Sequence, residues 1–172
     1  PVNRYPTGVH HKKFEWGLYH LVLDARARSG PIDLQIGRLD DLNVVRFHAR
    51  EVHGVTGVPY RWSRDRSLIV IDGIDPDASS LTLWMSSGGR PAAAPEPVTE
   101  VSLCGTLLGT VTPGEDVQAF AFPIDPALAR TLSDDGDPIR VEIRVPAWSP
   151  VDFVGGTDRR DLGVVVTRVQ VQ

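Results

Sequence analysis

The stretch IRVEIRVPAW, residues 139–148, has the clearest strand pattern in the chain. Aliphatic and charged residues alternate until the proline at position 146. The aliphatic positions are Ile139, Val141, Ile143 and Val145, and the charged positions are Arg140, Glu142 and Arg144. Because successive side chains of a strand point to opposite faces, the pattern predicts one buried and one solvated face. Such a strand is typical of an antiparallel sheet.

Similar β-rich runs extend in both directions from this stretch. They are PIDLQIG (31–37), YRWSRDRSLIVIDG (60–73), SSLTLWMSS (79–87), VTEVSLCG (98–105), TLLGTV (106–111) and DVQAFAFPI (116–124). Residues 60–73 fit either one strand or a hairpin that turns near Arg64–Arg66. In the last run, LGVVVTRVQV (162–171), the aliphatic positions change phase after Val166. That change predicts a β-bulge.

Turn-forming residues, 16 Gly and 14 Pro, fall between these runs. The rhythm predicts an all-β fold of about eight or nine strands. Two packed antiparallel sheets can bury so many alternating faces, so we expect a two-sheet, jelly-roll-like β-sandwich. One short helix or turn is expected near residues 126–132, where Asp125 can cap it and Pro126 takes the first helical position.

The domain organisation predicted is one β-sandwich over residues 31–172, preceded by a leader or linker over residues 1–30 that is partly ordered. Residues 1–13 are polar and lack periodicity, and FEWGLYHLVLDARARS (14–29) fits a short helix or a first strand. The start at a proline suggests a piece of a longer polypeptide.

Composition excludes several classes of function. The net charge of −4 disfavours a nucleic-acid binder, and no apolar run is long enough for direct membrane insertion. The chain shows no signal-peptide pattern, and its compartment stays undetermined. Cys104 is the single cysteine, so an intrachain disulfide or a multi-thiolate zinc site is ruled out; we expect it to be a small core residue.

The histidine-bearing segment RFHAREVHGVTGVPYRWS, residues 46–63, has some features of a metal site. Glu51 lies between His48 and His53, but the glycines and the proline that follow would break any helix that aligned two imidazoles. We therefore expect no metal, and no nucleotide or cofactor motif is present. A general-base role for His48 or His53 stays open, because histidine titrates near neutrality.

Aromatic residues provide candidate ligand contacts. Trp84 is out of phase with its aliphatic neighbours in residues 81–85, so it is expected on the opposite side of its sheet. Trp148 ends the strand that begins at Ile139, and Tyr60 begins another run. We take Trp84, Trp148 and Tyr60 as candidate ligand-binding residues, and ordinary packing of these rings is the alternative.

Charged residues near the C-terminus predict an ionic clasp. Asp158 and Arg160 are two apart, so they point the same way in an extended segment. Arg160 can pair bidentately with Asp158 or Glu51, and Arg61 can form similar pairs. We expect Glu51, Arg61, Asp158 and Arg160 to brace the fold rather than to react, since most other carboxylates lie in turn contexts.

These motifs, in their order along the chain, resemble β-sandwich modules attached to bacterial glycosyltransferases and polytopic membrane glycosyltransferase-like proteins. The matching residues are Phe47, Glu51, Tyr60, Arg61, Trp62, Ser63, Trp148, Pro150, Asp158, Arg160, Leu162, Gly163 and Val164. The resemblance covers residues 31–171 and implies a non-catalytic, carbohydrate-associated accessory domain with a parent or partner glycosyltransferase. Residues 1–30, and the stretch 48–56 apart from Glu51, depart from the pattern.

The leading hypothesis is a non-catalytic module that binds a glycan or docks against a glycan-handling enzyme. A structural surface or assembly module is the first alternative, with homo-oligomers formed through the basic segment 1–28. A carbohydrate-active enzyme is the second, and it would use Glu51 with Asp158 or a histidine. Two carboxylates about 5–10 Å apart would be needed for glycoside hydrolysis.

Overall fold

The structure is a computed structural model that describes residues 12–13, 19–20 and 30–172. Strands β1 (Lys12–Lys13) and β2 (Tyr19–His20) pair antiparallel. The predictions of a polar leader, and of a helix or strand over residues 14–29, otherwise lie outside the described residues.

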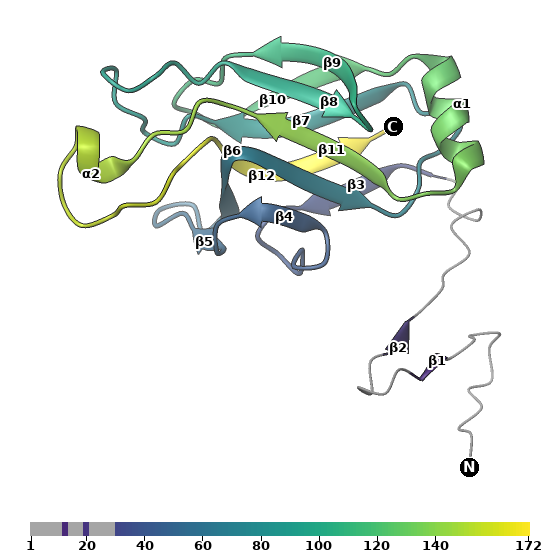
Figure 1. Cartoon of the computed structure of the whole chain (residues 1–172), viewed down its shortest axis with the longest axis horizontal. Helices are drawn as coiled ribbons and strands as arrows, with labels where there is room; N and C mark the ends of the chain where they lie inside the picture. Colours follow the sequence, from purple (N-terminus) through teal and green to yellow (C-terminus); the bar gives the residue numbers. More distant parts are fainter. Residues whose placement is uncertain (1–11, 14–18, 21–29) are drawn as a thin grey trace.

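The rest of the described chain is mostly strand, as predicted. The strands are β3 (Ile32–Gln35), β4 (Val44–Phe47), β5 (Glu51–Val52), β6 (Pro59–Ile71), β7 (Ser80–Ser86), β8 (Thr99–Leu103), β9 (Thr106–Val111), β10 (Gln118–Pro123), β11 (Ile139–Arg144) and β12 (Val165–Val171). Helix α1 (Pro126–Asp135) lies at one end of the strands and helix α2 (Pro150–Phe153) at the other (Figure 1).

Two antiparallel layers form a β-sandwich, which confirms the predicted fold class. The first layer has the order β10-β7-β12-β3, and the second has the order β4-β6-β11-β8-β9. The long strand β6 joins them, because Arg61 and Trp62 pair with β12 whereas residues 66–71 pair with β11. Within the segment 60–73, residues up to Ile71 therefore form one continuous strand, and the hairpin alternative is wrong.

The core lies between the inner faces of the two layers. Ile139, Val141, Ile143 and Val145 are all buried there, as their alternation predicted. In β12 the pairing with β7 shifts between Val166 and Arg168, which confirms the bulge. After the bulge, Val169 and Val171 are buried, and Gln170 between them belongs to the outer face.

Helix α1 begins and ends as its sequence indicates. The Asp125 side chain accepts hydrogen bonds from the Ala127 and Leu128 amides, and Gly136 ends the helix in the left-handed region at φ 66°. The helix is three residues longer than predicted, because the left-handed residue comes at position 136. Among the described residues, no helix is long and apolar enough to cross a membrane.

Cys104 is half-buried rather than part of the fully buried core. It adopts φ 47° in the turn between β8 and β9, ahead of Gly105 at φ 89°. Its Sγ accepts a hydrogen bond from the Arg140 amide at 3.3 Å. The turn geometry, which the sequence indicated at Gly105, moves Cys104 to the rim of the core.

Candidate functional site

The outer face of the first layer presents Trp84. Its neighbours Leu81, Leu83 and Met85 are fully buried on the inner side of β7, so the alternation directs Trp84 outward as predicted. The indole is half-buried. Trp84 thus contributes a large, partly open aromatic surface on a sheet face.

Arg168 covers one side of the Trp84 ring. The two residues are cross-strand partners, and the guanidinium carbon lies 4.5 Å from the ring centroid. The bulge after Val166 makes this contact possible, because strict alternation would have directed Arg168 into the core. Arg168 also binds Asp33 of β3 through Nε–Oδ1 and Nη2–Oδ2 contacts of 2.7 and 2.5 Å. These bonds lower the pKa of Asp33 and raise the pKa of Arg168.

On its other side, Trp84 lies next to edge strand β10, whose side chains are small at this position. Ala119 is the cross-strand partner of Trp84 on this side, Ala121 follows it, and both are exposed. A methyl group is too small to cover an indole ring. The large Phe122 of the same strand is buried in the core. Small, exposed side chains therefore border the ring on β10, in the same sheet face as Thr82 and Gln170, which are themselves cross-strand partners.

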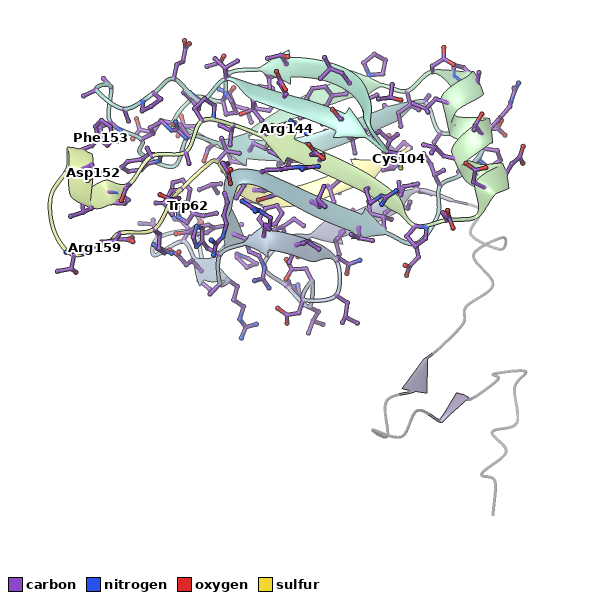
Figure 2. All side chains as sticks on the ribbon, viewed as in Figure 1. Trp62, Cys104, Arg144, Asp152, Phe153 and Arg159 are labelled. Atoms are coloured by element: carbon purple, nitrogen blue, oxygen red, sulfur yellow. The ribbon has the colours of Figure 1, made fainter. Side chains whose placement is uncertain are left out.

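Trp148 and Tyr60 do not lie on the sheet face that presents Trp84. Trp148 is 6% exposed and packs edge-on against Trp62 and Phe153, with ring centroids 6.4 Å apart in both pairs. Tyr60 packs against the same cluster. Figure 2 shows Trp62 and Phe153 towards the α2 end of the sandwich. The burial of Trp148 leaves no open ring face for a sugar, and its Nε1 has no hydrogen-bond partner among the described residues.

Arg160 is the centre of an ionic cluster close to Tyr60. Its Nε and Nη2 donate to Asp158 at 3.0 and 2.8 Å, and its Nη1 donates to Glu51 at 2.6 Å. The Tyr60 hydroxyl donates to the other Glu51 oxygen at 2.9 Å. Hydrogen bonds from the Arg160 side chain and amide lower the pKa of Asp158 to about 2. Bonds to both carboxylates raise the pKa of Arg160.

Arg61 joins a different pair of carboxylates, so it is not part of the Arg160 cluster. Its Nε and Nη2 each donate to Asp40 at 2.8 Å, and Nη2 also donates to Asp41 at 2.6 Å. The Asp40 side chain is 1% exposed, whereas that of Asp41 is 84% exposed. Burial alone would raise the pKa of Asp40, but hydrogen bonds from Arg61 and the Gly37 amide outweigh it and lower the pKa.

His48 and His53 both form hydrogen bonds with backbone groups. The His48 Nε2 donates to the Asp161 carbonyl at 2.8 Å. The His53 Nδ1 accepts from the Val55 and Thr56 amides at 3.3 and 3.2 Å, which closes the turn between β5 and β6. In the part of the chain that the structure describes, no group of three or more His, Cys, Asp or Glu could hold a metal ion.

Arg90 is a structural residue that the sequence pattern did not single out. Its guanidinium donates to the carbonyls of Pro95, Pro146 and Gly163 at 2.6, 2.9 and 2.8 Å. It therefore ties the proline-rich loop to the ends of β11 and the segment before β12. Burial lowers the pKa of Arg90 to about 10, which leaves it charged at neutral pH. Its Nε is buried without a partner among the described residues.

Comparisons with known proteins give distant structural likenesses. No family model and no curated protein matches the chain. A GH26-CBM35 β-(1,4)-mannanase of Podospora anserina shares 11% identity over 84% of this chain and 28% of its own, with a TM-score of 0.46. A family 35 carbohydrate binding module from Clostridium thermocellum shares 10% identity over 83% of this chain and 98% of its own, also with a TM-score of 0.46. The chain thus spans about a quarter of the mannanase polypeptide, and these values do not place it in a family.

Proposed function

We propose that this domain is a non-catalytic glycan-binding module whose ligand contacts Trp84. The observation that carries the proposal is a half-buried tryptophan on a sheet face, covered by Arg168 on one side and bordered by exposed Ala119 on the other. The flat apolar face of an indole can pack against the C–H face of a pyranose ring. The ligand would therefore lie across this sheet face, against the exposed part of the indole.

Polar side chains beside Trp84 would bind the sugar hydroxyls. Thr82, Gln170 and Gln35 carry hydroxyl or amide groups, and none of their side chains forms a hydrogen bond within the part of the chain that the structure describes. Amides and hydroxyls both donate and accept, as sugar hydroxyls do. A site of this kind binds sugars by stacking and by shared hydrogen bonds.

The enzyme alternative is disfavoured by the state of its two carboxylates. Glu51 and Asp158 both accept hydrogen bonds from Arg160. A glycosidase needs one carboxylic acid whose pKa is raised so that it can protonate the leaving group. The pKa of Asp158 is instead lowered to about 2, so this residue would be ionised across the neutral range.

Docking to a parent or partner glycosyltransferase stays a prediction of the sequence resemblance. Assembly through residues 1–28 likewise stays a prediction, since nearly all of that segment lies outside the described residues. Removal of residues 1–28, followed by measurement of molecular mass over a concentration series, would test the assembly prediction. A full-length chain that is monomeric throughout would contradict it.

Trp84→Ala is the direct test of the proposed site. Burial of one ring face, about half of the roughly 200 Å² of a tryptophan, contributes about 2 kcal/mol to binding, or about 30-fold in affinity. Affinity electrophoresis against a panel of polysaccharides, followed by calorimetry on any that bind, would measure the loss.

Phe153→Ala is the matched control, since Phe153 is 40% exposed at the α2 end and contacts Trp148. We expect it to bind as the unmodified protein does. Absence of binding to every polysaccharide, or loss in Phe153→Ala but not in Trp84→Ala, would contradict the proposed site.

A further inference from the structure

Strands β3, β7, β10 and β12 carry two charged residues, Asp33 and Arg168. Both belong to the outer face that presents Trp84, and they form one ion pair. The face around the indole therefore has no net charge from its own strands, in a chain whose net charge is −4. This distribution bears on the chemistry of any ligand that lies against Trp84.

The ion pair fixes both partners in one geometry. The Asp33 carboxylate accepts from Nε and Nη2 of Arg168, one bond to each oxygen, and the guanidinium stacks on Trp84. The two side chains remain partly exposed, at 36% for Arg168 and 47% for Asp33. A ligand beside Trp84 therefore meets a carboxylate and a guanidinium that already neutralise each other.

Resting on the proposed function, we propose that the Trp84 site selects neutral glycans and that Asp33 is the residue that excludes uronate-containing ones. A uronate carboxylate near Arg168 would face the Asp33 carboxylate, and like charges repel unless one is displaced. A neutral sugar hydroxyl can donate to Asp33 or accept from Arg168 without breaking their pair. Specificity thus comes from a repulsive element built into the sheet face.

The test uses pairs of polysaccharides that share a backbone and differ in charge. Suitable pairs are unsubstituted xylan with glucuronoxylan, hydroxyethyl cellulose with carboxymethyl cellulose, and methyl-esterified pectin with polygalacturonate. For the backbone that the protein binds, we expect the neutral member to bind about tenfold more tightly than the charged member in low-salt buffer. Equal or tighter binding of the charged member would overturn the inference.

Asp33→Asn is the informative variant, because it keeps the size of the side chain and leaves Arg168 unneutralised. We expect it to bind the charged member about tenfold more tightly than the unmodified protein does, with this gain lost in high salt. Asp134→Asn makes the same charge change on exposed α1 and should alter neither affinity. A charged-member affinity that rises equally in both variants would overturn the role of Asp33.

The outcomes separate the two proposals. Absence of binding to all probes, or binding that Trp84→Ala leaves unchanged, contradicts the glycan site itself. Binding that depends on Trp84 but favours the charged member supports the site and contradicts the selection for neutral glycans. If Asp33→Asn failed to fold, the comparison of paired polysaccharides with the unmodified protein would still decide the question.

Discussion

Replacement of Asp40 by Ala should destabilise the domain by about 3–5 kcal/mol, because it leaves the buried Arg61 guanidinium without its main partner. The side chains of Arg61 and Asp40 are only 8% and 1% exposed. Asp40 accepts two bonds from Arg61 and one from the Gly37 amide, all at 2.8 Å. Each bond to a charged group contributes about 1.5–3 kcal/mol net, and part of the loss is recovered when water reaches the guanidinium.

Asp41 provides the matched control for this prediction. It also pairs with Arg61, but its side chain is 84% exposed, so its pair should contribute less than about 1 kcal/mol. Urea unfolding followed by tryptophan fluorescence would give both free energies of unfolding. A double variant, Asp40→Leu with Arg61→Met, should recover much of the loss, because an apolar pair can replace a buried ion pair. Equal effects of Asp40→Ala and Asp41→Ala, or a loss below about 1 kcal/mol in Asp40→Ala, would refute the reasoning.

Two further predictions concern the other arginines. Arg90→Met should lower the free energy of unfolding by about 2–4 kcal/mol, since three carbonyls lose a charged donor. Arg90→Lys should also lower the free energy of unfolding, because a lysine ammonium lacks the planar fork of donors that a guanidinium has. An unchanged melting temperature in either variant would contradict this prediction. Asp158, whose pKa lies at about 2 instead of 3.8, contributes stability above about pH 4 that is lost as the pH falls towards 2. Melting temperatures measured from pH 5 to 2 should therefore fall less steeply in Asp158→Asn, and parallel curves would count against the Arg160 pair.

The strands and the bulge could be predicted because they depend on local alternation. Residues 139–145 need only their own pattern to show which face is buried. The change of phase in the aliphatic pattern after Val166 likewise indicates the bulge that directs Arg168 outward. The direction of Trp84 follows from its place between Leu83 and Met85. Each of these features depends on residues only a few positions apart, so each can be predicted from one sequence.

The partners of Arg61 and the burial of Trp148 could not be predicted in the same way. Asp40 is 21 residues from Arg61, in a loop whose aspartates look like ordinary turn residues. Trp148 is buried because Trp62, 86 positions earlier, and the short helix α2 pack against it. The bonds of Arg90 run to backbone carbonyls, which every residue has, so no side-chain pattern indicates them.

The difference between bracing and binding residues follows from which hydrogen-bonding groups the fold already uses. Arg160 directs Nε, Nη1 and Nη2 at Glu51 and Asp158, so its donors are already bonded to these carboxylates. Trp84 has the opposite character, since Arg168 lies over the ring and its cross-strand partner on β10 is a small, exposed alanine. A ligand that contacts Trp84 adds interactions without removing any, because the nearby ion pair can remain closed. Binding at the outer face is therefore compatible with unchanged contacts, whereas chemistry at Glu51 and Asp158 would compete with their hydrogen bonds to Arg160.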